Sequence, residues 1–203
     1  MQKLLIATTN RGKLDEISGL LANLPVKLVS LSDVGIQDDV EETGKTFLEN
    51  SLIKANFYAK KSNLPSISDD GGLMINALNG APGVKSRRWL GYSATDDELI
   101  DHMEKIAGQL PDNNRTAYFK TVITLALPDG RVWSKSGEVK GIIAKQPHLK
   151  KVPGLPYRSF FFLPQLNKFY FETELSDKEK KQFNHRYKAI EKLKPILKKE
   201  LHL

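Results

Sequence analysis

The N-terminal part of the chain joins an apolar run to a polar segment, Leu4-Leu5-Ile6-Ala7-Thr8-Thr9-Asn10-Arg11-Gly12-Lys13. Apolar residues then recur at helical spacing from Leu14 to Leu24, so this stretch predicts a strand, a polar loop and a helix. A second unit of this kind has a strand over 26–31, an acidic loop over 37–42 and a helix over 46–61. Strands that alternate with helices are typical of α/β folds.

The following segments predict hairpins as well. Residues 66–73 combine a brief strand with a loop of two carboxylates and two glycines. A long strand over 116–127 turns at 128–130 into a strand over 131–134, which forms an antiparallel hairpin. A further strand is expected over 137–143. Together with the helical segments, these strands predict an α/β fold with a mixed sheet.

Two capping boxes and one irregular segment complete the pattern. Thr95 with Glu98, and Ser176 with Glu179, have the spacing that marks helix N-termini. Residues 146–164 contain four prolines, so we expect a loop there.

Composition limits the class of protein. The chain has 203 residues, 40% of them hydrophobic, and this length is typical of a single globular domain with its own core. It has no cysteine, which excludes thiol catalysis, cysteine-bound zinc and iron–sulfur chemistry. We expect a cytoplasmic protein, because neither a signal peptide nor an apolar run of about 18 residues is present.

Two groups of residues could bind an anion and a cation. The loop Thr8-Thr9-Asn10-Arg11-Gly12-Lys13 precedes a helix, and helix N-termini attract anions, although an ordinary capped turn has the same pattern. Glu41 and Glu42, with Asp69 and Asp70, supply the oxygen ligands that Mg²⁺ prefers. Asp70 could also accept a proton from an attacking water, whereas the alternative for such residues is helix capping or solvation.

A third group lies near the C-terminus, where Lys180 precedes His185 and Arg186. At ideal helical spacing Lys180 and His185 point about 140° apart, so a break between them is required if both are to face one ligand. The anion loop, the carboxylates and these cations together describe a site for a nucleoside triphosphate with Mg²⁺.

These motifs resemble, in order and over nearly the whole chain, those of the inosine triphosphate pyrophosphatase family. The family's Thr/Ser-x-Asn-x-x-Lys loop is matched at 8–13, and its Glu-Glu-Thr-Gly stretch at 41–44. Its Asp-Asp-Ser-Gly-Leu and Ala-Leu-x-Gly-Ala-Pro-Gly-Val elements are similar to 69–73 and 77–84. Its Ser-Ala-Arg becomes Ser86-Arg87-Arg88, and its Lys and His-Arg pair fall on Lys180 and 185–186.

The resemblance implies a fold and a reaction. The fold would be an elongated central mixed sheet flanked by helices, in a single domain over 1–203 with two lobes around a cleft, usually as a homodimer. The reaction would be Mg²⁺-dependent hydrolysis of non-canonical purine nucleoside triphosphates, of the ITP, dITP and XTP type, to the monophosphate and pyrophosphate.

The resemblance also implies residue roles. Asp70 would be catalytic, and Glu42 and Asp70 would bind the metal. The implied substrate-binding residues are Thr8, Thr9, Asn10, Arg11, Gly12, Lys13, Gly71, Arg88, Leu155, Pro156, Tyr157, Arg158, Lys180, His185 and Arg186. Among them, the loop 8–13 and Lys180 would hold phosphates, and His185 and Arg186 would lie near the base.

The chain departs from the family pattern in two places. Gly71 replaces the serine after the paired aspartates, which removes a hydroxyl donor. The family's Gly-Phe-Gly-Tyr-Asp-Pro base loop reads Gly154-Leu155-Pro156-Tyr157-Arg158-Ser159 here. Because donors replace an acceptor in this loop, we predict an altered base preference.

Two alternatives stay open. The chain could be a nucleotide-binding protein that has lost efficient catalysis, although a pure binder has no need for the acidic cluster. Residues 178–200 carry nine Lys or Arg against three Glu, so a nucleic-acid-binding domain is the other alternative. We do not expect it, because the only aromatic residues of the segment, Phe183 and Tyr187, have the i, i+4 spacing of a buried helix face and are not interleaved with the charges for stacking.

Overall fold

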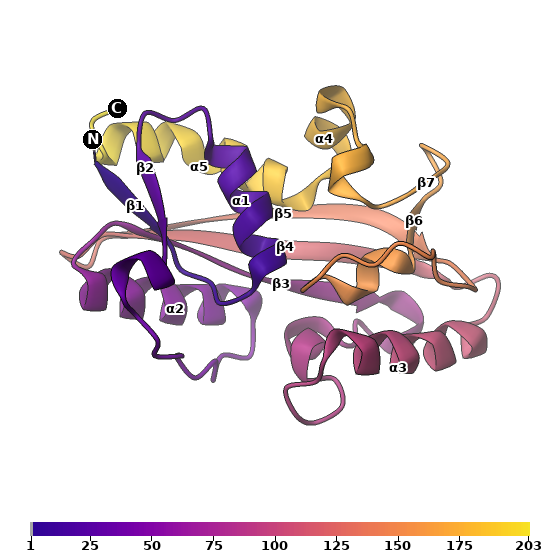
Figure 1. Ribbon diagram of the computed structural model, residues 1–203. Helices are drawn as coiled ribbons and strands as arrows, with labels where there is room; N and C mark the ends of the chain where they lie inside the picture. The colour runs from indigo at the N-terminus through magenta and orange to yellow at the C-terminus, as the bar shows by residue number, and fades with distance from the viewer. Residues whose placement is uncertain (1) are drawn as a thin grey trace. The chain divides into compact units, whose positions relative to one another are not determined.

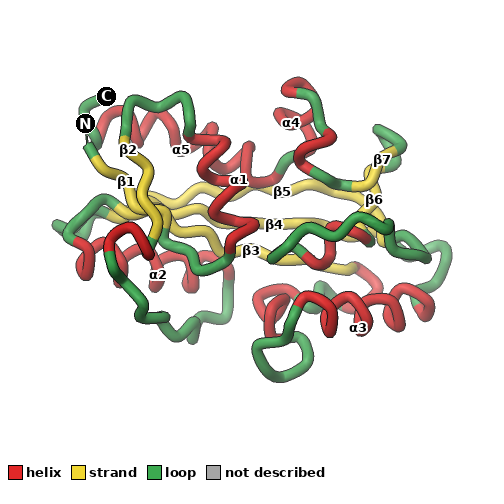
Figure 2. Tube along the Cα trace, viewed as in Figure 1, coloured by secondary structure: helices red, strands yellow, loops and turns green. Residues whose placement is uncertain are grey.

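The computed structural model describes residues 2–203, and its elements form an α/β fold (Figures 1 and 2). Within these residues seven strands form one sheet, in the order β2-β1-β3-β4-β5-β6-β7. The strands are β1 (Lys3–Ile6), β2 (Lys27–Ser30), β3 (Ser66–Ile75), β4 (Thr116–Ala126), β5 (Val132–Ile143), β6 (Phe161–Leu163) and β7 (Lys168–Phe169). The α-helices are α1 (Arg11–Leu21), α2 (Phe47–Ser62), α3 (Asp96–Gln109), α4 (Asp177–Phe183) and α5 (His185–Glu200).

The sheet is mixed, as the sequence predicts. Strand β1 pairs in parallel with β2 and with β3. Strands β5 and β6, and β6 and β7, pair antiparallel. No helix within residues 2–203 is long and apolar enough to cross a membrane.

The chain forms two compact units. Unit 1 contains the residues up to Asp70, together with 121–137 and 186–203. Unit 2 contains 71–120 and 138–185. The division cuts β3, β4 and β5, so each of these strands contributes to both units.

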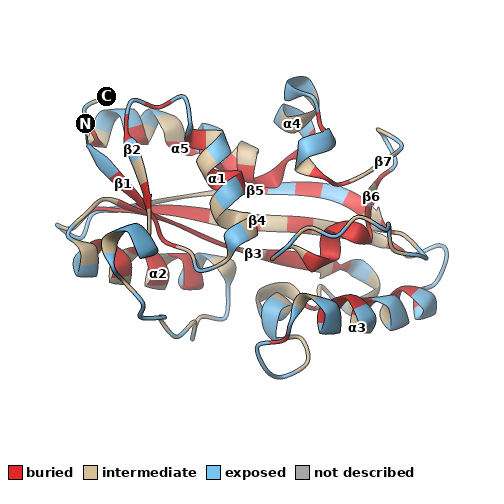
Figure 3. Ribbon diagram, in the orientation of Figure 1, coloured by how far each residue is buried: buried red, intermediate tan, exposed pale blue. Residues whose placement is uncertain are grey.

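The core of unit 1 follows the alternation of side chains along β1. Leu4 and Ile6 pack with residues of α1 and α5, whereas Leu5 packs with Tyr58 of α2. Successive side chains of a strand point to opposite faces, so α1 and α5 cover one face of β1 and α2 covers the other. Figure 1 shows this arrangement, and Figure 3 colours the buried residues of these strands and helices red.

Unit 2 has its own core, built on α3. The capping box of Thr95 and Glu98 starts this helix, as predicted. Leu99, Met103 and Ala107 recur at helical spacing and are buried in one cluster with apolar residues of β3, β4, β5 and β6.

Three predicted boundaries are wrong. Asp69 to Gly72 lie inside β3, not in a loop, because this strand continues to Ile75 between β1 and β4. The strands expected over 131–134 and 137–143 are one strand, β5. The predicted loop over 146–164 contains β6, whose Phe161 and Leu163 are buried.

The helix is broken between Lys180 and His185, as the third group of residues requires if both are to face one ligand. Helix α4 ends at Phe183, Asn184 has extended backbone angles, and α5 begins at His185. Lys180 and His185 therefore belong to different helices, and the ideal-helix angle between them does not apply.

Candidate functional site

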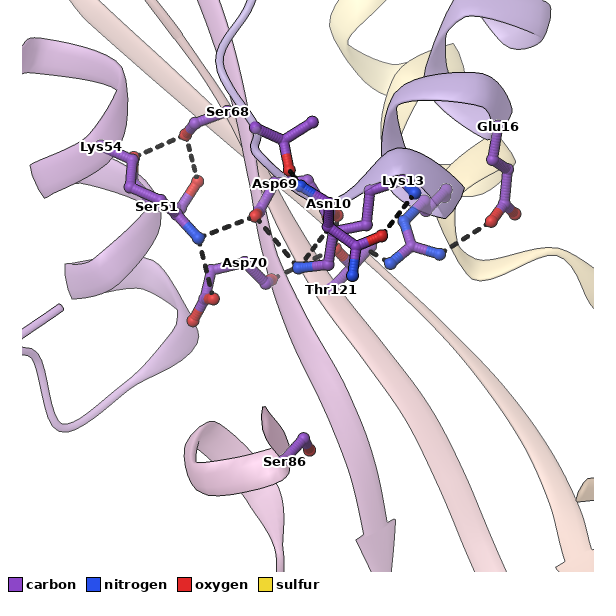
Figure 4. A network of polar contacts seen from close by, with 12 residues as sticks. Asn10, Lys13, Glu16, Ser51, Lys54, Ser68, Asp69, Asp70, Ser86 and Thr121 are labelled. Carbon is purple, nitrogen blue, oxygen red and sulfur yellow. Dashed lines mark hydrogen bonds and ion pairs between the residues drawn. The ribbon is translucent and has the colours of Figure 1, made fainter. Parts of the chain in front are cut away.

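Unit 1 contains a buried network of ionised side chains, which we call the charged cluster (Figure 4). It joins residues from α1, α2, β3, α5 and the acidic loop. Its members are Lys13, Glu16, Glu42, Lys54, Asp69, Asp70 and Arg186.

Because β3 is pleated, the side chains of Asp69 and Asp70 point to opposite sides of the strand. Ile67 packs in the core of α1 and α5, whereas the hydroxyl of Ser68 donates to the carbonyl oxygen of Ser51 on α2. Asp69 and Asp70 continue this alternation, so the Asp69 side chain meets α1 and α5 and the Asp70 side chain meets α2. Figure 4 shows Lys13 approaching from α1 and Lys54 from α2.

Asp69 is a fully paired carboxylate. Its Oδ2 lies 3.0 Å from Nζ of Lys13 and 3.2 Å from Nη2 of Arg186. The hydroxyl of Thr121 donates to Oδ1. Burial alone would raise the pKa of Asp69, but Arg186 and Lys13 hold this pKa well below its usual range. Asp69 therefore stays ionised and links β3 to α1 and α5.

Arg186 joins a second acid to this side of the strand. Its Nη1 donates to Oε2 of Glu16, on α1, at 2.8 Å. Both side chains are almost fully buried, so Arg186 ties Glu16 and Asp69 together by charge-assisted hydrogen bonds.

Lys54 bridges the acids on the other side. Its Nζ lies 2.7 Å from Oε1 of Glu42 and 3.1 Å from Oδ1 of Asp70, and it also donates to the carbonyl oxygen of Asp69 at 3.0 Å. Burial alone would lower the pKa of Lys54, but Asp70 and Glu42 raise it above its usual value. Lys54 therefore remains a cation between the two carboxylates that the sequence predicts as metal ligands.

Asp70 is only partly satisfied. Its Oδ2 is buried and has no hydrogen-bond partner. Burial raises the pKa of Asp70, and Lys54 and Lys13 lower this pKa by less. Of the seven members of the charged cluster, three are basic and four are acidic.

These features fit a cation with few protein ligands. Among residues 2–203, His, Cys, Asp and Glu form no group of three or more that could hold a metal ion. Mg²⁺ is commonly bound by one or two carboxylates together with water and substrate phosphates. Asp70, with its unpartnered oxygen, and Glu42 supply that donor set.

The predicted anion loop is shorter than expected, because α1 begins at Arg11. Asn10 is the N-cap, and its Oδ1 accepts a hydrogen bond from the Lys13 backbone N–H at 3.0 Å. The Asn10 N–H in turn donates to the hydroxyl of Thr8 at 3.2 Å. Residues 11–13 therefore form the first helical turn, and the Asn10 cap already binds the Lys13 amide.

The other predicted residues lie in unit 2. Gly71 follows the charged cluster in β3, and Arg88 is exposed at the end of the 3₁₀ helix Gly83–Arg88. Lys180, on α4, lies 2.8 Å from Oε1 of Glu172.

The base loop forms the 3₁₀ helix Pro156–Ser159, whose residues are all buried; Leu155 precedes it. The hydroxyl of Tyr157 donates to the carbonyl oxygen of Ser86 at 2.6 Å. Arg158 lies over the ring of Tyr170, and His185 Nδ1 is 2.7 Å from the Tyr170 hydroxyl oxygen.

Lys54 and Tyr170 are not among the site residues that the sequence predicts. A signal for Lys54 exists, because Ser51, Lys54, Ala55 and Tyr58 share the buried face of α2. A lysine on a core-facing stripe is rarely buried unless it is paired. Tyr170 has no comparable signal, since it lies just after the two-residue strand β7.

The chain is thus an α/β protein in which the strand β3 carries two buried aspartates paired with lysine and arginine side chains. The chain belongs to the Ham1 family, whose model matches residues 4–196.

Relatives of full length support this assignment. A dITP/XTP pyrophosphatase of Geobacter sulfurreducens is 39% identical over 201 residues, 97% of each chain. One of Shigella flexneri is 36% identical and covers 95% of this chain and 96% of its own. A HAM1 protein structure from Coxiella burnetii is 36% identical, with a TM-score of 0.80, and covers 98% of this chain and all of its own.

Proposed function

We propose that the chain hydrolyses non-canonical purine nucleoside triphosphates, of the ITP, dITP and XTP type, to the monophosphate and pyrophosphate. Two observations support this. The first is full-length similarity to proteins named dITP/XTP pyrophosphatase. The second, which carries the proposal, is the buried oxygen of Asp70 that has no hydrogen-bond partner.

Asp70 is the proton acceptor in this proposal. Its unpartnered Oδ2 can accept the proton of a water molecule as that water attacks a phosphorus atom. Lys54 holds the other oxygen and so fixes the direction of the carboxylate.

Glu42 and Asp70 would hold Mg²⁺. When bound, the metal would supply Lewis-acid stabilisation of the triphosphate oxygens. Lys54 keeps the two carboxylates together, since it contacts both. The repulsion between the Glu42 and Asp70 carboxylates therefore does not have to be overcome when Mg²⁺ binds.

The phosphates would lie at the N-terminus of α1. We assign Thr8, Thr9, Asn10, Arg11 and Gly12 to this binding, since the first turn of α1 offers backbone amides to an anion. Nζ of Lys13 forms an ion pair with Asp69. Its positive charge also acts on the neighbouring Asp70, whose pKa it lowers. Lys180 of unit 2 is also assigned to phosphate binding. Gly71 has no side chain, so only its backbone N–H is assigned to this binding.

The base is assigned to residues of unit 2 together with Arg186. These are Arg88, Leu155, Pro156, Tyr157, Arg158 and His185. Since Arg158 is stacked on Tyr170 and Tyr157 donates to a backbone carbonyl, both are held in place before any substrate binds. A loop with these side chains supports our proposal of an altered base preference.

Pyrophosphate release by the purified protein with Mg²⁺ tests the proposal, with ITP, dITP, XTP, GTP, ATP and dUTP compared. We expect turnover that Asp70→Asn abolishes and that a chelator removes. A strong selectivity for ITP over ATP and GTP would contradict the altered base preference. Binding of all nucleotides without turnover would contradict the enzyme and favour a nucleotide-binding protein. The homodimer and the cytoplasmic location stay predictions.

A further inference from the structure

The loop that carries Glu42 is attached to helix α2 at two points. Residues 37–46, all of which the structure describes, lie in neither a helix nor a strand. At the first point, Nζ of Lys54 donates to Oε1 of Glu42 at 2.7 Å. At the second, the backbone N–H of Gly44 donates to Oδ1 of Asn50 at 2.7 Å. Helix α2 therefore binds both the side chain of Glu42 and the backbone two residues after it.

Both attachments come from one face of α2. Asn50 and Lys54 lie four positions apart, so their side chains project from the same side of the helix. Both residues are buried, and Asn50 has no exposed surface. Lys54 also lies 3.1 Å from Oδ1 of Asp70. A displacement of the loop from this face would therefore separate Glu42 from Asp70.

The orientation of the Asn50 amide follows from its partner. A backbone N–H can only donate, so the atom that faces Gly44 is the carbonyl oxygen Oδ1. Nδ2 of Asn50 is buried and has no hydrogen-bond partner among the described residues. A buried donor without a partner is unfavourable, and an apolar side chain at this position would avoid that cost. The bond to Gly44 is thus the contact that accounts for an amide at position 50.

Gly44 permits the close approach of the loop to α2. A Cβ at position 44 would lie 2.5 Å from Oδ1 of Asn50 and 2.6 Å from Cβ of Glu49, so a larger residue would push the loop away. Oε2 of Glu49 accepts hydrogen bonds from the next two backbone N–H groups, those of Lys45 and Thr46. Three successive amides of the loop are therefore bound by two successive side chains at the start of α2.

We propose that Asn50 is a positioning residue that holds Glu42 in place for the cation. This part rests on the proposed function, in which Glu42 and Asp70 bind Mg²⁺. The bond to Gly44 fixes the backbone of the loop, while Lys54 fixes the carboxylate. A loop that is ordered beforehand does not have to lose conformational entropy when the ligand binds, which raises affinity. Asn50 touches neither the cation nor the substrate and acts only through the loop.

Amide hydrogen exchange of the metal-free protein, followed by NMR, tests the attachment of the loop. Asn50→Leu removes the acceptor and keeps a side chain of similar volume. We expect the Gly44 amide to exchange about 3- to 10-fold faster, the effect of one neutral hydrogen bond. Asn56→Leu is the matched control on α2, because the Asn56 amide donates only within the helix, to the carbonyl oxygen of Leu52. Unchanged Gly44 exchange in Asn50→Leu, or equal acceleration in Asn56→Leu, would overturn the proposal.

Binding of Mn²⁺ without nucleotide, measured from the EPR signal of the free ion, tests the effect on the cation site. Mn²⁺ is a suitable probe because, like Mg²⁺, it prefers oxygen ligands. Loss of a residue that supports a metal ligand typically costs about 10- to 100-fold in affinity, and we expect Asn50→Leu to raise the Kd by this factor. Asn56→Leu should leave the Kd unchanged. Equal Kd values for the unmodified protein and Asn50→Leu would overturn the role of Asn50.

Gly44→Ala gives a second test, which holds even if Asn50→Leu does not fold. The added methyl group would displace the loop while the side chains of α2 stay as they are. We expect the same rise in the Kd for Mn²⁺. An unchanged affinity in Gly44→Ala would also overturn the proposal.

The Mg²⁺ dependence of ITP hydrolysis separates this role from the proposed function. We expect Asn50→Leu to raise the Mg²⁺ concentration for the half-maximal rate about 10-fold and to leave kcat at saturating Mg²⁺ within about 3-fold. A fall in kcat with an unchanged Mg²⁺ requirement would overturn the positioning role. If the unmodified protein neither binds Mn²⁺ nor hydrolyses ITP, the proposed function fails, whereas Gly44 exchange still decides whether Asn50 holds the loop.

Discussion

Two neighbouring aspartates lie on opposite sides of β3 in unit 1 and differ in how fully their carboxylates are paired. On the side of α1 and α5, Asp69 is paired with Lys13, Arg186 and Thr121. On the side of α2, Asp70 shares Lys54 with Glu42 and keeps one buried oxygen without a partner. Full pairing stabilises a structure, whereas an unsatisfied buried acceptor is retained at a cost of about 1–3 kcal/mol. The comparison therefore indicates a structural role for Asp69 and a chemical role for Asp70.

Asp70→Asn is expected to have the largest effect on activity and little effect on stability. Loss of a positioned proton acceptor typically lowers the rate about 10²- to 10⁴-fold. Lys54 still contacts Glu42 and the carbonyl oxygen of Asp69 in this variant, so no cation is left unpaired. Pyrophosphate release and urea denaturation measure the two effects. A variant that unfolds but keeps full turnover per folded molecule would reverse the comparison.

Asp69→Asn is expected to destabilise the protein strongly. The substitution removes the charge that Lys13 and Arg186 share, and breaking a buried ion pair from one side costs about 3–5 kcal/mol. The free energy of unfolding, from urea denaturation, is the measurement. A loss as small as that of Asp70→Asn would show that the pairing on this side does not stabilise the fold.

Lys54→Met tests the bridge on the side of α2. Without the ammonium group, Glu42 and Asp70 lose their shared partner, and we expect a loss of about 1–3 kcal/mol in the free energy of unfolding. Lys61→Met is the control on the same helix, since Lys61 forms a partly exposed ion pair with Asp38. Such exposed pairs contribute about 0–1 kcal/mol. Equal losses in the two variants would contradict the role of Lys54 as a buried bridge.

The smallest effect is on the pH dependence of stability. Because the folded pKa of Asp70 is raised above the usual value of 3.8, the folded state binds this proton more tightly than the unfolded state. Asp70 therefore lowers stability as the pH rises from 3.8 through its folded pKa. Asp69 has a lowered pKa, so its contribution is present above 3.8 and is lost below it.

Urea denaturation of the unmodified protein and of Asp70→Asn across this range isolates the contribution of Asp70. We expect the stability of the unmodified protein, relative to the variant, to fall as the pH rises above 3.8. A constant difference would show that the proton affinity of Asp70 does not change on folding.

Local sequence patterns account for much of what could be predicted. The capping boxes at Thr95 and Ser176 start helices α3 and α4, because a cap is made by residues three positions apart. The mixed sheet follows from the order of apolar runs and turns. The extent of β3 could not be predicted, since Asp69-Asp70-Gly71-Gly72 has the composition of a loop and is held as a strand by its neighbours in the sheet.

The sequence by itself determined the class of fold and the order of the motifs, because these depend on residue type and short spacing. The choice of Glu42 and Asp70 as candidate ligands came from the resemblance of these motifs to those of a known family. Only the tertiary structure decided which partners these acids have. Lys54 lies 16 positions from Asp70, and Arg186 lies 117 positions from Asp69. Ion pairs of such separation depend on which helices pack on each side of β3. That packing fully pairs Asp69 and leaves one oxygen of Asp70 unpartnered.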